Sequence, residues 1–232
     1  MKRLLLFDID GTILDSGGTG LGALRDGIVN AFDLQSRADA MPDLDLAGAT
    51  DASVARELFA AFGIQDTPEH RQQFFDSYAT ALRTAFIENG DCARLLPGIQ
   101  QLLGKLEAEN NAHLGLLTGN IETGARIKLG HFGVDSHFAF GAFGDDAEHR
   151  DELGPIALDR ARRHVGASIE PSHSVVIGDT PRDIACARAA GMKVIAVATG
   201  GFSLFELKSC EPDAVLANFE DVSATAELIR VI

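Results

Sequence analysis

The chain has 232 residues, of which 46% are hydrophobic, and a formal net charge of −14. This length and hydrophobic content allow one full-sized α/β domain, or a core with a modest insertion. The acidic balance and the lack of any basic segment argue against nucleic acid as a partner, because such a partner requires a cationic face against its phosphates.

An apolar run, Leu4–Phe7, opens the chain and leads into Asp-Ile-Asp-Gly-Thr at residues 8–12. This pattern predicts a buried strand with two carboxylates at its carboxyl end, where open α/β sheets bind ligands. Asp8 and Asp10 can address one pocket if the chain keeps or slightly bends its extended geometry, and Gly11 makes that bend easy. Asp8 and Asp10 interrupt the apolar run after a few residues, so the run is too short for a signal peptide or a membrane span. Since the three scattered cysteines also favour a reducing compartment, we expect a soluble, cytoplasmic protein without a membrane partner.

Residues 15–22 are rich in glycine and predict a loop that could serve as a hinge. From Leu24 to about Leu96 the apolar spacing is helical and lacks convincing strands, and a polar stretch, Gln35–Leu46, interrupts the helices. Thr50 or Asp51 is expected to cap the helix that follows.

Pro97 and Gly98 mark a return to the main domain, and a helix is expected from Ile99 to about Leu106. The next segment, residues 113–117, reads as a short buried strand that ends at Thr-Gly-Asn, residues 118–120, before a helix over residues 121–131. Free amides and the helix dipole make such a strand end an anion site, and a simple helix cap by Asn120 is compatible with it.

Later segments repeat the alternation of strand and helix. Strands are expected at residues 138–143, 174–177, 194–197 and 213–216, with helices over residues 149–165 and from Pro181 to about Gly191. The alternation predicts an α/β fold with a Rossmann-like parallel sheet and helices on both faces. We expect residues 1–14 and 97–232 to form this core, and residues 15–96 to form a small all-helical cap inserted after the first strand.

The predicted strand ends bring Asp8, Asp10, Thr118 and Asp179 into one crevice. Carboxylates so close repel one another unless they share protons or a cation lies among them. Because the set contains oxygen ligands and neither His nor Cys, the expected cation is Mg²⁺, which also binds substrate phosphate oxygens.

Residues 8–12, residues 118–120 and Gly178-Asp179-x-x-x-Asp183, in this order, resemble three motifs of the haloacid dehalogenase (HAD)-like hydrolase superfamily, in its phosphoglycolate-phosphatase-like subclass with a helical cap. The resemblance implies that Asp8 is the nucleophile and that Asp10 is the general acid and then the general base. It also implies that Asp8, Asp179 and the backbone carbonyl of Asp10 hold Mg²⁺, with Asp183 supporting the metal through a water or a hydrogen bond.

The same resemblance assigns phosphate binding to Thr118, to the amides of Gly119 and Asn120, and to a cation of a remaining motif, for which Arg150 is the candidate. The commoner pattern there is a lysine followed closely by proline, whereas Pro155 lies five residues beyond Arg150. The rival cations are Lys128, Arg160 and Arg162. In related enzymes the region around residues 48–51 can face the substrate, which is an alternative to capping.

A carboxylate at Asp10 favours phosphate-ester hydrolysis within the superfamily, because an oxygen leaving group needs a proton. The expected activity is therefore a Mg²⁺-dependent phosphatase that acts on a small phosphorylated metabolite through an aspartyl-phosphate, with the cap closing over the substrate. The alternatives are a sugar-phosphate mutase and a non-catalytic phosphate-binding module. Nothing in the sequence specifies an oligomeric state.

Overall fold

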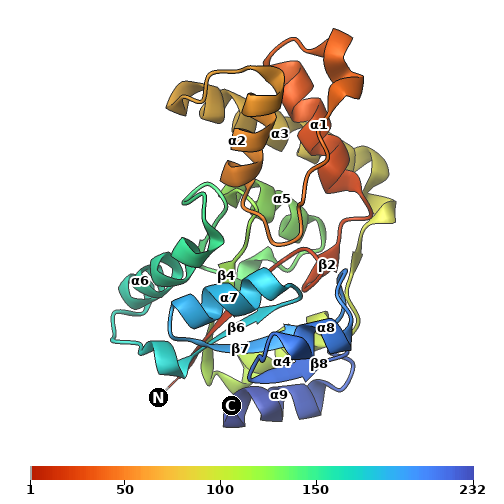
Figure 1. Ribbon diagram of the computed structural model, residues 1–232. Coiled ribbons are helices and arrows are strands. Elements are labelled where there is room, and N and C mark those ends of the chain that lie inside the picture. The colour runs from red at the N-terminus through yellow and green to blue at the C-terminus, as the bar shows by residue number, and fades with distance from the viewer. Residues whose placement is uncertain (1) are drawn as a thin grey trace.

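The computed structural model describes residues 2–232, apart from the side chains of residues 38 and 39. A six-stranded parallel sheet with strand order β5-β4-β1-β6-β7-β8 forms its centre (Figure 1). The strand β1 (Arg3–Phe7) lies in the middle of the sheet, between β4 and β6. The other strands of this sheet are β4 (Ala112–Leu117), β5 (Gly141–Ala142), β6 (Ser174–Gly178), β7 (Lys193–Val197) and β8 (Ala214–Leu216). The predicted Rossmann-like α/β class is confirmed.

Side chains that alternate along β1 supply the cores on both faces of the sheet. Leu5 and Phe7 pack with helices α4 (Ile99–Glu109), α5 (Glu122–His131) and α9 (Val222–Val231). Leu4 and Leu6 pack on the opposite face with α6 (Leu153–Val165), α7 (Pro181–Ala189) and α8 (Leu204–Ser209). The unbroken apolar run at the start of the chain is therefore a strand that is buried on both faces.

Helices α1 (Thr19–Ala31), α2 (Asp51–Phe62) and α3 (Pro68–Asn89) share a separate hydrophobic cluster, and Figure 1 shows them together beyond one edge of the sheet. The first and third of these helices approach closely at Gly27, where an added Cβ atom would lie 2.7 Å from the Tyr78 Cα atom. The polar stretch that was expected to interrupt the helices contains a short 3₁₀ helix, Gln35–Ala40.

Three local predictions were wrong. The glycine-rich loop ends early, because Gly18 adopts φ 84° as the N-cap and α1 begins at Thr19. The segment expected to lack strands contains β3 (Arg94–Leu95), which pairs with β2 (Leu14–Asp15) in an antiparallel ribbon too short to produce a sequence pattern. The strand expected over residues 138–143 is only the two-residue β5, which pairs with the last two residues of β4.

Among the described residues, every helix is too short or too polar to cross a membrane.

Candidate active site

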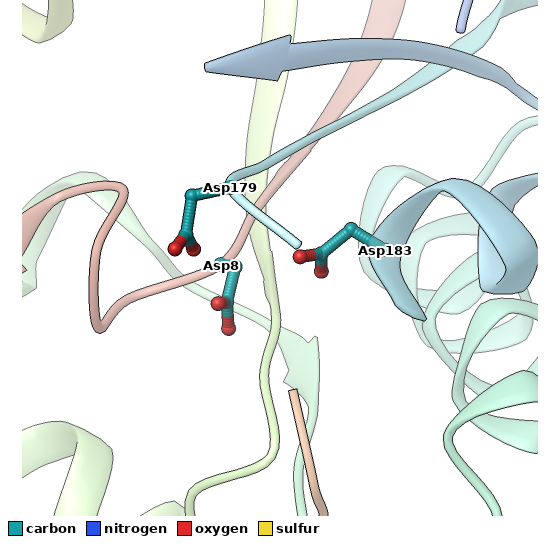
Figure 2. A group of neighbouring side chains, drawn as sticks. All are labelled: Asp8, Asp179 and Asp183. Carbon is teal, nitrogen blue, oxygen red and sulfur yellow. The ribbon is translucent and has the colours of Figure 1, made fainter. Parts of the chain in front are cut away.

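Three buried carboxylates gather at the carboxyl end of the sheet (Figure 2). Asp8 follows β1, Asp179 follows the neighbouring strand β6, and Asp183 lies in the first turn of α7. One oxygen from each carboxylate lies within 4.8 Å of the others. The cluster forms because two adjacent parallel strands end at the same edge, where the following turns are free to present side chains.

Arg150 provides the positive charge next to this cluster. Its side chain is buried, its Nη2 atom lies 3.1 Å from Asp8 Oδ1, and the same nitrogen donates a hydrogen bond to Asp183 Oδ1. The second oxygen of Asp183 accepts hydrogen bonds from the Thr180 amide at 3.0 Å and the Thr180 hydroxyl at 2.7 Å. Both oxygens of Asp183 are thus engaged by the protein, and the bond from the Thr180 amide is part of the capping box that starts α7.

Burial changes the acidity of the other two carboxyl groups. Burial raises the pKa of Asp8 to about 6, although Arg150 opposes this rise. Burial, followed by the charges of Asp8 and Asp183, raises the pKa of Asp179 to about 8. A set made only of carboxylates suits a hard divalent cation, whose charge would favour the ionised form of each acid.

Two glycines provide the space that the Asp179 carboxylate occupies, because neither has a Cβ atom. At Gly200, an added Cβ atom would lie 1.7 Å from Asp179 Oδ2, and at Gly11, which adopts φ 82°, it would lie 2.3 Å from the same oxygen. No other residue type fits at either position without moving the carboxylate.

The loop after β4 contains the predicted phosphate-binding residues. Gly119 lies against Arg150, since an added Cβ atom would be 3.3 Å from Arg150 Nη1. Among the described residues, the Gly119 amide donates to no protein acceptor, whereas the Asn120 amide lies 3.3 Å from Thr118 Oγ1. Asn120 does not form the simple helix cap that the sequence allowed beside the anion site: Ile121 occupies the N-cap position of α5, and the Asn120 side chain turns toward Asp10.

Asp10 lies apart from the three-acid cluster and contacts a second cation. Lys128 Nζ lies 2.6 Å from Asp10 Oδ2 and 2.6 Å from Asn120 Oδ1. Of the four candidate cations, Arg150 and Lys128 line the cavity described below. Arg160 instead binds Asp146 and Arg162 binds the Ile169 carbonyl, so among the described residues neither of these two arginines lines that cavity.

The start of α2 docks on the same loop. The Thr50 side chain accepts a hydrogen bond from the Ser53 amide at 3.1 Å, which confirms capping by Thr50. The Asp51 carboxylate instead accepts a hydrogen bond from the Ile121 amide at 2.8 Å, and the Asp51 amide donates to the Gly119 carbonyl at 2.7 Å. Burial raises the pKa of Asp51 to about 7, and the Ile121 amide and the charge of Lys128 oppose this rise.

A cavity of about 610 Å³ is lined by Asp8, Asp10, Asp179, Lys128 and Arg150, and it has the size of a pocket for a small molecule. Its lining combines strand-end residues with residues of the helical segment, among them Leu24, Asp51 and Tyr78. Sequence reasoning gave no role to Thr12, whose hydroxyl donates to Asp179 Oδ1 at 3.2 Å, or to Thr199, whose hydroxyl donates to the Gly11 carbonyl at 2.6 Å. Both follow strands at this sheet edge, and that position is a signal that could have identified them.

A parallel sheet with buried acids, a buried guanidinium and a cavity at the carboxyl ends of its strands is typical of an α/β enzyme. Residues 5–197 match the family described as haloacid dehalogenase-like hydrolase, so the chain belongs to this family, as the motifs predicted, and is an enzyme of the hydrolase type.

Relatives align with nearly the whole chain. The chain is 27% identical to "Probable phosphatase IndB" of Dickeya dadantii, with 99% of this chain and 95% of that protein covered. It is also 27% identical to a phosphoglycolate phosphatase of Photorhabdus laumondii, with 97% and 93% covered. The fold is similar to the crystal structure of a hydrolase from Pseudomonas syringae, at a TM-score of 0.71, 21% identity and 99% coverage of both chains.

Proposed function

We propose that this protein is a Mg²⁺-dependent phosphatase that hydrolyses a small phosphorylated metabolite through an aspartyl-phosphate. The observation that carries the proposal is the separation of two carboxylates in one cavity. Asp8 is close to Asp179 and forms an ion pair with Arg150, whereas Asp10 forms an ion pair with Lys128. Different surroundings suit these two acids to different roles, one as a nucleophile and one as a proton carrier. The phosphatase names of the two curated relatives support the same class of reaction.

The donor set fits Mg²⁺. Asp8 and Asp179, together with the backbone carbonyl of Asp10, would hold the ion. Asp183 would act indirectly, because both of its oxygens already accept hydrogen bonds from Arg150 and Thr180. When bound, the ion supplies positive charge to the phosphoryl oxygens and lets a phosphate dianion approach an acidic site.

The protein side chains carry both steps of the proposed reaction. In the first step a carboxylate oxygen of Asp8 forms a bond to phosphorus, the ester P–O bond breaks, and Asp10 gives its proton to the leaving oxygen. In the second step Asp10 takes a proton from water as the water oxygen bonds to phosphorus, and the bond between phosphorus and Asp8 breaks. Thr118, the amides of Gly119 and Asn120, and Arg150 would bind the phosphoryl oxygens as charge spreads over them.

We propose that residues 15–96 are the cap and that residues 1–14 and 97–232 are the catalytic core. The hydrophobic cluster of α1, α2 and α3, which Ile121 of the core joins at its border, supports this division. The residues that this segment contributes to the cavity would exclude bulk water during the reaction and limit the size of the substrate.

A panel of phosphorylated metabolites tests the proposal. Purified protein with Mg²⁺ should release inorganic phosphate from at least one small phosphomonoester, in many turnovers per enzyme. Conversion of a sugar phosphate into its isomer, with a phosphoenzyme that hydrolyses slowly, would instead indicate a mutase. Phosphate binding without turnover on any substrate would indicate a non-catalytic module.

A further inference from the structure

Lys128 is a buried ammonium group whose partners belong to the candidate site. The side chain comes from α5 and only 4% of it is exposed. The first turn of α1 covers it, because a Cβ atom added at Gly20 would lie 3.6 Å from Lys128 Nζ. A buried ammonium group is retained only where it is paired, and the two acceptors of Lys128 are Asp10 Oδ2 and Asn120 Oδ1, each at 2.6 Å.

These three residues form a closed set of hydrogen bonds. Asn120 Nδ2 also donates to Asp10 Oδ2, at 2.8 Å, and to Thr118 Oγ1, at 2.9 Å. Within the described part of the chain, the side-chain donors to the Asp10 carboxylate therefore both act on Oδ2. Two donors on one oxygen fix the rotation of the carboxylate and leave the other oxygen for a substrate or a water.

Arg150 and Lys128, both buried, contact different acids. Arg150 contacts Asp8 and Asp183, whereas Lys128 contacts Asp10. Arg150 already lies at the cluster and against Gly119, so a phosphoryl-binding role for Lys128 is not required.

We propose that Lys128 is the positioning residue of Asp10, an inference that rests on the proposed phosphatase function. The ammonium group and Asn120 hold Asp10 by Oδ2, so that Oδ1 carries the proton. In the first step the Oδ1–H bond breaks and the proton passes to the leaving oxygen of the ester. In the second step a water O–H bond breaks and its proton passes to Oδ1, which restores the acid. Lys128 gains and loses no proton in this cycle.

Leaving-group chemistry separates this role from phosphoryl binding. A good leaving group such as 4-nitrophenolate needs little protonation, whereas an alkoxide needs a proton donor in the correct position. Lys128→Met keeps the length of the side chain and removes the charge. We expect it to lower kcat/KM, which reports the steps up to departure of the leaving group, about 10²-fold on an alkyl phosphomonoester, the lower limit for general acid catalysis, with a far smaller loss on 4-nitrophenyl phosphate.

Two further variants complete the experiment. Lys105→Met is the matched control, because Lys105 is a half-exposed lysine on α4 paired with Glu109, and it should keep wild-type kinetics on both substrates. Lys128→Arg keeps the charge and should recover part of the loss on the alkyl ester. If Lys128→Met does not fold, Lys128→Arg decides alone, since its wider guanidinium displaces Asp10 and should also reduce activity more on the alkyl ester.

A double-mutant cycle tests whether Lys128 acts through Asp10. In an Asp10→Asn background, Lys128→Met should add almost no further loss on the alkyl ester, because residues that act as a unit are not additive. Equal losses of kcat/KM on the two substrates, or additive losses in the cycle, would overturn the positioning role. Turnover by the wild-type protein would then leave the phosphatase proposal standing. A wild-type protein inactive on all phosphomonoesters would overturn both proposals.

Discussion

Replacing Arg150 with alanine tests the centre of the candidate site. The guanidinium group is buried and lies between Asp8 and Asp183, 3.1 Å from the first of these acids. Its removal leaves acidic groups without their shared cation and takes one donor from the predicted phosphoryl site. Loss of a donor to a developing oxyanion typically lowers kcat by about 10²-fold or more, so we expect at least that loss in kcat/KM. Breaking a buried ion pair typically costs about 3–5 kcal/mol of stability, so the Tm should fall as well.

The assay is steady-state hydrolysis of the best phosphomonoester at saturating Mg²⁺, with thermal unfolding measured on the same samples. Arg150→Lys should recover part of the activity, because it keeps the charge but loses the bidentate geometry of the guanidinium group. Arg160→Ala is the matched control: this arginine binds Asp146 and the Gly141 carbonyl outside the cavity, and the variant should keep nearly wild-type kcat/KM.

Near-wild-type kinetics for a folded Arg150→Ala variant would refute this reasoning. The phosphoryl-binding cation would then have to be Lys128, the other candidate that reaches the cavity. A fall in Tm without a loss of kcat/KM would mean that Arg150 only compensates the charge of the buried acids.

Activity should need Mg²⁺ and disappear with excess chelator. Ca²⁺ should bind but support little turnover, because its coordination shell is larger and looser. Full activity in chelator, or equal turnover with Ca²⁺, would contradict this prediction. Asp8→Asn should fold but form no phosphoenzyme, and an acid-stable phosphoprotein in that variant would exclude Asp8 as the nucleophile. Burial raises the pKa of Asp51 from 3.8 to about 7 in the folded protein. The folded state therefore favours the protonated carboxyl group, and the stability that this group contributes is fully present below pH 3.8 and is lost as the pH rises through about 7. Asp51→Asn should therefore gain stability over wild type between pH 5 and pH 8, by at most about 4 kcal/mol, and a Tm difference that does not change with pH would contradict the shift.

The positions of Asp8, Thr118 and Asp179 could be predicted because each directly follows an apolar run that forms a strand. A strand is recognised from consecutive residues, and the parallel arrangement then brings the strand ends to one edge. The two-residue strands β3 and β5 lack such a signal, since their pairing depends on a partner elsewhere in the chain.

The contacts between distant residues could not be predicted in the same way. Asp10 and Lys128 are 118 residues apart, and Lys128 by itself looks like a residue on the solvated face of a helix. It is buried because α1 lies over α5, which is a property of tertiary packing and not of local spacing. Likewise, Asp51 stands where a helix cap is expected, but its neighbour Thr50 is the cap and the Asp51 carboxylate reaches Ile121.

The loop of residues 118–121 is held from two sides, and this links the helical segment to the chemistry of the sheet edge. On the sheet side, the Thr118 amide donates to the Ala142 carbonyl at 3.1 Å. On the other side, hydrogen bonds join the first two residues of α2 to the carbonyls of Gly119 and Gly144 and to the Ile121 amide. Each such bond contributes about 0.5–1.5 kcal/mol, so α2 cannot move away without a cost comparable to losing a substrate contact. Because the same peptide groups flank the predicted phosphate site, we expect a phosphoryl group that orders this loop to favour the docked position of α2 as well.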